Sequence, residues 1–198
     1  MNTLAGSARP TRIRSLGRGT QYSGICIMGF SIIHKKGQFE GGLGPVQLRR
    51  VPNLPGSYAV IMYIDRSLSL CVGALGRSDL KVGYYCYVGS AFGPGGLRGR
   101  LGHHVRGGDR FHWHVDYLRS VAEIVEIWWT MDSCKREHDW ARVLGGELRL
   151  VIPIRGFGSS DCSCRAHLFY AKSKPSVRSF SRRLHLRYPN HGCIHSMS

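Results

Sequence analysis

Five side chains suggest chemistry in this sequence: Tyr58, Tyr87, Arg100, His104 and Glu137. Hydrolysis of a phosphodiester needs an activated water, a cation on the phosphate and, in most enzymes, a divalent metal held by carboxylate. Arginine matches phosphate with two parallel donors, and glutamate offers the hard oxygen that Mg²⁺ prefers. A tyrosine can act as a base only if nearby positive charge lowers its pKa from about 10. The alternative is two core tyrosines, a surface arginine and a solvated glutamate.

Hydrophobic periodicity predicts the elements that position these residues. Apolar and aromatic runs indicate strands over 58–64, 68–75 and 80–89, joined by tight turns into an antiparallel meander. Further strands are expected over 121–129 and 167–170, whereas 148–154 is either a strand or an extended crossing. Helical spacing predicts helices over 97–105 and 111–118, and another that begins near Asp132 or Ser133 and runs to about Leu144.

These elements predict an α/β (α+β) domain with a small, mainly antiparallel sheet flanked by helices. We expect the domain to span residues 54–171. Residues 1–53 are predicted to be a basic and mostly disordered extension, and residues 172–198 a basic disordered tail rich in Ser and Pro.

The net charge of +16 and the pI of about 10.1 indicate a polyanionic partner, most plausibly nucleic acid. Residues 1–55 hold eight Lys/Arg against one acid, residues 56–171 fourteen against eleven, and residues 172–198 six against none. The charge therefore lies mainly on the flanks, where it either contacts nucleic acid or only keeps the chain soluble.

Seven cysteines, an odd and scattered set, do not fit a secreted disulfide scaffold. No run of residues approaches the roughly 20 apolar positions of a membrane span, and the apolar run 25–33 lacks a cleavage pattern. We therefore expect a cytoplasmic protein without a membrane partner. The sequence does not predict its oligomeric state.

Several motifs, in order along 54–171, resemble the GIY-YIG nuclease superfamily. They include Gly56-Ser57-Tyr58, Tyr87-Val88-Gly89, and the spacing of Leu97, Arg100, Leu101 and His104, followed later by a helical glutamate. Together with 93–97, 112–118 and 156–164, they are similar to a poorly characterised branch that occurs alone in prokaryotes or fused to endonuclease-III-type DNA repair glycosylases. Position 57 is Ser where the superfamily has Ile, and the segment between Tyr58 and Tyr87 is longer than usual.

The resemblance implies roles for individual residues. Tyr58 would be the general base, Tyr87 and Arg100 would contact water and phosphate, and Glu137 would hold one Mg²⁺ or Mn²⁺. Glu123 and Glu126 lie close enough in sequence to be alternatives to Glu137. His104 is added as a candidate catalytic residue. We expect Ser90, Arg98 and His114 to bind the substrate.

A second constellation is Cys162, Cys164 and His167, whose thiolates and imidazole are good ligands for Zn²⁺. A structural zinc site needs a fourth ligand, and His103, His104, His112 and His114 are available. The alternative is that the thiols are small buried groups beside a core histidine. A third constellation, His112 and Asp116, would share a helix face and either orient an imidazole, contact phosphate or accompany Trp113 into the core.

The leading hypothesis is a metal-dependent endonuclease that hydrolyses phosphodiester bonds in DNA, in preference to RNA, with a role in repair. The alternative is a non-catalytic nucleic-acid-binding module stabilised by zinc. A third interpretation is a structural partner protein in which the histidines and cysteines only pack.

Overall fold

The computed structural model of the protein describes residues 43, 47–107 and 110–198. Its centre is an antiparallel sheet in the order β6-β4-β1-β5-β7, and β2 and β3 form a separate hairpin. The strands are β1 (Ser57–Ile64), β2 (Leu68–Cys71), β3 (Arg77–Leu80), β4 (Gly83–Ser90), β5 (Glu123–Thr130), β6 (Leu168–Ala171) and β7 (His195–Met197). The helices are α1 (Gly96–Arg106), α2 (His114–Arg119), α3 (Glu137–Arg142) and α4 (Val177–Arg187). The predicted α+β class with a mainly antiparallel sheet is confirmed.

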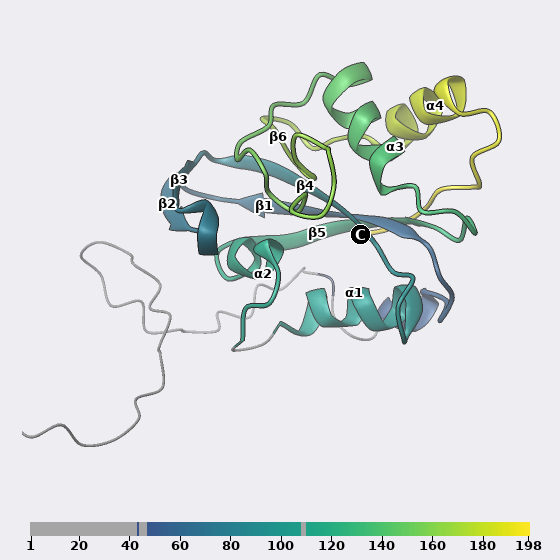
Figure 1. Cartoon of the computed structure of the whole chain (residues 1–198), viewed down its shortest axis with the longest axis horizontal. Helices are drawn as coiled ribbons and strands as arrows, with labels where there is room; N and C mark the ends of the chain where they lie inside the picture. Colours follow the sequence, from purple (N-terminus) through teal and green to yellow (C-terminus); the bar gives the residue numbers. More distant parts are fainter. Residues whose placement is uncertain (1–42, 44–46, 108–109) are drawn as a thin grey trace, which may run out of the picture.

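Helices cover both faces of the sheet, with α1 and α2 on one side and α3 and α4 on the other (Figure 1). The alternation of side chains along each strand divides the core into two layers. Val60 and Met62 of β1 face Leu97 and Leu101 of α1. Ala59 and Ile61 face the opposite layer, which contains buried residues of α3 and α4. Both faces of β1 are thus buried, as its nearly continuous apolar sequence predicts.

The pairing of β1 with β4 brings the two tyrosines together. Tyr58 is opposite Gly89, and Val60 is opposite Tyr87. Because alternate residues share one face of a sheet, Tyr58 and Tyr87 are diagonal neighbours on the face that α1 covers. In the predicted meander the strand over 68–75 would separate these two strands, whereas in the structure they pair directly.

The predicted meander is wrong in one respect, because the middle strand does not lie in the main sheet. The strand expected over 68–75 ends at Cys71, and Gly73–Leu75 form a 3₁₀ turn. On either side of this turn, the Val72 amide donates a hydrogen bond to the Gly76 carbonyl. The chain then returns through β3, so β2 and β3 pair only with each other. This hairpin accommodates the long segment between Tyr58 and Tyr87 outside the sheet.

Other boundaries shift by a few residues, and two helices begin later than the periodicity indicates. The expected helix over 111–118 begins only at His114, where Asp116 accepts hydrogen bonds from the preceding amides of His112 and Trp113. The helix expected from Asp132 begins at Glu137 and continues as a π-helical segment, Val143–Glu147. The segment 148–154 is an extended crossing with a single bridge from Val151 to Tyr170.

The predicted disorder of residues 172–198 is wrong. Residues 177–187 form α4, which buries Phe180 and Leu184, and residues 195–197 form the edge strand β7 on β5. Most of the predicted N-terminal extension lies outside the described residues. Within the described part, Gln47–Arg50 form a 3₁₀ turn (η1), and Leu48 and Val51 are buried in the core, so the domain includes residues assigned to the extension.

Candidate functional site

Tyr58 lies near the start of β1 with its hydroxyl bound to the imidazole of His104. The distance from Tyr58 Oη to His104 Nε2 is 2.8 Å, and both side chains are buried. The tyrosine ring lies over Gly89, where an added Cβ would be only 2.6 Å from Oη. The absence of a side chain at position 89 is therefore what lets the ring reach α1.

Tyr87 is the second aromatic residue of the site. Its ring makes edge contacts with His104 at 6.1 Å and with Phe157 at 6.0 Å between ring centroids. Gly158, which has a φ of 72°, approaches so closely that an added Cβ would be 2.9 Å from Tyr87 Cε2. The loop after residue 155 thus forms one wall of the site.

Arg100 on α1 is held beside these residues by an aromatic ring. Its guanidinium carbon is 4.2 Å from the centroid of the Trp113 ring, a cation–π contact. The Arg100 side chain is partly exposed, and Trp113 is 40 % exposed. A positive group is therefore presented to solvent next to the buried tyrosine and histidine.

Glu137 reaches the site from the start of α3. Its Oε1 accepts a hydrogen bond of 3.2 Å from Ser90 Oγ, at the end of β4. Its Oε2 is buried and has no hydrogen-bond partner among the described residues. A buried carboxylate oxygen without a partner is costly unless a cation or water satisfies it.

The structure distinguishes Glu137 from the two alternative carboxylates. Glu126 lies in the opposite layer, where Oε1 accepts from Trp128 Nε1 at 2.8 Å and Oε2 pairs with Lys174 at 2.9 Å. Glu123 is at the far end of β5, opposite Tyr63 of β1. Glu137, in contrast, raises the pKa values of both Tyr58 and Tyr87 and binds Ser90, the partner of Ser57 next to Tyr58.

Burial keeps both tyrosines protonated. It raises the pKa of Tyr58 well above 10, and Tyr87 adds to this rise while Arg100 opposes it. Burial likewise raises the pKa of Tyr87 to about 12 despite Arg100. The condition expected for a tyrosine base, a pKa lowered by positive charge, is therefore not met, because desolvation outweighs the arginine.

His104 is neutral at physiological pH. Burial lowers its pKa to about 3, and the nearby His103 and Arg119 act in the same direction. Its Nδ1 is buried and has no hydrogen-bond partner among the described residues. A neutral imidazole can accept a hydrogen bond from the tyrosine hydroxyl through Nε2, although its low pKa opposes full transfer of the proton.

The low pKa of His104 should make the protein less stable in acid. The unfolded state takes up a proton near pH 6.5 and the folded state does not, so stability falls as pH drops below about 6.5. At pH 5 the expected loss from this one residue is about 2 kcal/mol. Urea denaturation at pH 8 and pH 5 measures this loss as a difference in the free energy of unfolding.

Two variants test the assignment to His104. His104→Asn should reduce the difference in unfolding free energy between pH 8 and pH 5, whereas His112→Asn, at an exposed position, should leave that difference unchanged. An identical pH difference in wild type and His104→Asn would contradict the assignment.

The three predicted substrate-binding residues have different environments. Ser90 binds Glu137, as described above. Arg98 is exposed, but its Nε donates to the Val51 carbonyl at 2.8 Å and so anchors the segment that precedes β1. His114 Nδ1 accepts from the Gly158 amide at 3.0 Å, and partial burial lowers its pKa.

The third constellation differs from its prediction. The imidazole next to Asp116 is that of His103, whose Nε2 is 3.1 Å from Asp116 Oδ1. Only the backbone amide of His112 contacts Asp116, since His112 precedes the helix. Trp113 remains at the surface beside Arg100 and does not enter the core.

Four side chains form a group that can hold a metal ion: His138, Cys162, Cys164 and His167, whose ligand atoms all lie within 4.8 Å of one another. The sequence predicted the last three. His138 was missed because it lies on α3, far from the cysteines in sequence, and no spacing rule links it to them.

The comparisons with known proteins place the chain in a family. The sequence model of the domain of unknown function DUF123 matches residues 57–189. The chain belongs to this family. No curated protein and no solved structure matches the chain.

The DUF123 match contains every candidate residue discussed above. It also contains α4, which agrees with the packing of this helix against the rest of the domain. The description of the family states no activity, so the chemistry has to be inferred from the arrangement of side chains. Within the described residues, no helix is long and apolar enough to cross a membrane.

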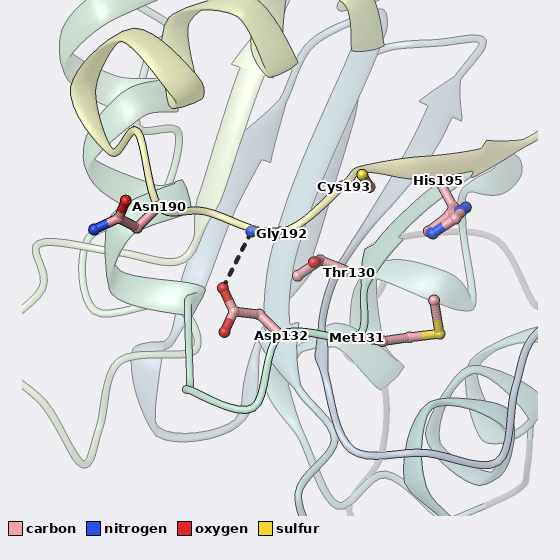
Figure 2. A pocket seen from close by; sticks show the side chains of 7 residues that line it. All are labelled: Thr130, Met131, Asp132, Asn190, Gly192, Cys193 and His195. Atoms are coloured by element: carbon pink, nitrogen blue, oxygen red, sulfur yellow. Dashed lines mark hydrogen bonds between the residues drawn. The ribbon is translucent and has the colours of Figure 1, made fainter.

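An open pocket lies between the end of β5 and the C-terminal segment, mostly beyond the DUF123 match. Its volume is about 250 Å³, and Figure 2 shows Asp132 directed toward the Gly192 amide, a hydrogen bond of 3.3 Å. None of the sequence-predicted site residues lines it; the lining consists of Thr130, Met131, Asp132, Asn190, Gly192, Cys193 and His195. The tyrosine site is therefore a separate feature.

Proposed function

We propose that the protein is a metal-dependent endonuclease that hydrolyses phosphodiester bonds in DNA, consistent with the resemblance of its motifs to the GIY-YIG superfamily. The observation that carries the proposal is the convergence of Tyr58, Tyr87, His104, Arg100 and Glu137 at one end of β1 and β4. Tyr58 contacts His104 directly, and its pKa is affected by Tyr87, Arg100 and Glu137. Convergence of a proton acceptor, a cation and a carboxylate is what phosphodiester hydrolysis requires.

Activation of water would run through Tyr58 and His104 together. With the imidazole proton on Nδ1, Nε2 is free to accept the Tyr58 hydroxyl proton over 2.8 Å. Tyr58 would take a proton from the attacking water as it gives its own to His104, so no free tyrosinate is needed. Burial disfavours the imidazolium that forms, so the negative charge of the bound phosphate would have to stabilise it. This relay fits the raised pKa of Tyr58, which excludes a standing negative charge on its oxygen.

Arg100 would hold the phosphate through its planar guanidinium, whose orientation Trp113 supports. Glu137 is the residue that would hold Mg²⁺ or Mn²⁺, because Ser90 occupies Oε1 and leaves the buried Oε2 free. Mg²⁺ keeps most of its waters and often takes one protein carboxylate. When bound, the ion would stabilise negative charge on the phosphate and the leaving oxygen.

Replacement of the relay hydroxyl tests the proposal. Tyr58→Phe keeps the ring over Gly89 but removes the proton that passes to His104, and general acid–base groups contribute about 10²–10⁴-fold to rates. We expect nicking of supercoiled plasmid with Mg²⁺ to fall by at least about 10²-fold.

The matched control is Tyr63→Phe, a half-buried tyrosine at the other end of β1 whose ring contacts Tyr84. This control should cleave like wild type. Equal Mg²⁺-dependent nicking by wild type and Tyr58→Phe would exclude the relay, and absence of nicking on every DNA and RNA substrate would favour the alternative below.

The alternative function is a nucleic-acid-binding module without turnover, stabilised by zinc. The specific observation in its favour is the basic surface of α4, where Arg178, Arg182, Arg183 and Arg187 are all exposed. Such a module predicts binding that weakens steeply with salt, needs no Mg²⁺ and leaves the strand intact. Measuring the salt dependence and the strand integrity in the same samples separates the two functions.

A further inference from the structure

Two separate segments supply the four metal-ligand side chains. His138 lies in the first turn of α3, and Cys162, Cys164 and His167 belong to the loop that leads into β6. His138 Nδ1 is 3.1 Å from Cys164 Sγ, and Cys162 Sγ is 3.6 Å from His167 Nε2. In a tetrahedral zinc site with ligands about 2.0–2.3 Å from the ion, neighbouring ligand atoms are about 3.3–3.8 Å apart. These two distances are close to that geometry, and all four ligand atoms lie within 4.8 Å of one another.

Hydrogen bonding between these side chains explains their arrangement less well than a shared zinc ion does. A thiol is a weak donor and a weak acceptor, so the contacts of Cys162 and Cys164 with each other, with the two histidines and with the Ser159 carbonyl are a weak reason for four donors to lie within 4.8 Å. Both cysteines are free thiols. Two sulfur and two nitrogen donors in a compact group are typical of zinc.

The loop holds its ligands in place through its own backbone. The His167 amide donates to the Phe157 carbonyl, and the His167 carbonyl accepts from the Val88 amide of β4, both at 2.8 Å. The Gly156 amide donates to the Arg165 carbonyl at 2.9 Å, which closes the base of the loop. The ligands are thus presented from a folded loop and not from a free end.

We propose that His138, Cys162, Cys164 and His167 bind one Zn²⁺ ion with a structural role. Four protein ligands close the coordination shell and leave no position for a reacting water. The ion joins the loop to the start of α3. Phe157 and Gly158 of the same loop contact Tyr87 and His114, so the ion also supports one wall of the tyrosine site.

The metal content of the full chain tests this assignment. Protein purified under reducing conditions should contain about one zinc per chain by elemental analysis, without stoichiometric iron or copper. Cys162→Ser and Cys164→Ser should lose the zinc. The matched controls Cys134→Ser and Cys193→Ser, at exposed positions outside the group, should retain it. Wild-type protein that is folded but neither contains nor takes up zinc would overturn the proposal, as would zinc retained in both site variants.

Measurements on the wild-type chain avoid the objection that a variant fails to fold. Replacement of zinc by Co²⁺ should produce thiolate-to-cobalt absorption and the intense visible bands of tetrahedral cobalt. Free Zn²⁺ at about 100 times its Kd should raise Tm by about 5–10 °C over the chelated protein. Weak octahedral cobalt bands and an unchanged Tm would overturn the proposal.

The zinc site and the proposed nuclease function can be rejected independently of each other. Glu137→Gln should keep one zinc per chain and lose Mg²⁺-dependent cleavage. If Glu137→Gln cleaves normally while Cys162→Ser loses zinc, the nuclease site is wrong and the zinc site stands.

Discussion

Glu137→Ala should abolish Mg²⁺-dependent cleavage of DNA while leaving DNA binding nearly unchanged. The substitution removes both the oxygen held by Ser90 and the buried oxygen that has no partner in the described structure. A metal ion contributes several kcal/mol to stabilising the transition state, and 1.36 kcal/mol is a factor of ten in rate. We therefore expect a loss of about 10³-fold or more in the nicking rate.

Two further variants make this result specific. Glu137→Gln retains the shape and the oxygen that accepts from Ser90 but removes the charge, so it should also fail to cleave. Glu147→Ala removes a half-buried carboxylate from the π-helical segment after α3, 4.0 Å from Arg187, and should cleave like wild type. Comparable cleavage by Glu137→Ala and Glu147→Ala would eliminate Glu137 as the metal ligand.

Local sequence was enough to predict the pair of tyrosines and the helix beside them. The apolar runs around Tyr58 and Tyr87 are strands in the structure, and the spacing of Leu97, Leu101 and His104 places His104 on the buried face of α1. These features depend on side-chain alternation and helical period, which act over a few residues. What the sequence could not give was the pKa of Tyr58, since desolvation depends on the whole surrounding core.

The fourth metal-ligand residue, His138, shows a different limit of prediction from the sequence. Cys162, Cys164 and His167 stand close together in the sequence and were found by their spacing. His138 meets them only because α3 and the loop before β6 lie together in the fold, with His138 Nδ1 3.1 Å from Cys164 Sγ. Its position directly after Glu137 was the one available signal, and it became meaningful only with the tertiary structure.

The composition of the C-terminal segment is typical of a disordered tail, which is why the prediction from sequence is wrong there. Six basic residues, serines and prolines surround only a few apolar side chains. Phe180 and Leu184 are four residues apart and therefore share one face of a helix. Phe180 packs on Trp128 and Trp140, with ring centroids at 5.1 and 4.9 Å. Tertiary packing, and not intrinsic propensity, stabilises this helix.

Leu184→Ala should therefore destabilise the whole domain. Leu184 is fully buried, and loss of a buried leucine costs about 2–5 kcal/mol, a large part of the 5–15 kcal/mol that typically holds a domain together. Leu186 lies on the same helix but is 70 % exposed, so Leu186→Ala should change stability by less than about 0.5 kcal/mol. Urea denaturation followed by tryptophan fluorescence measures both, since Trp128 and Trp140 line the contact. A disordered tail predicts equal, negligible effects for the two leucines, whereas a docked α4 predicts a difference of about 2 kcal/mol or more.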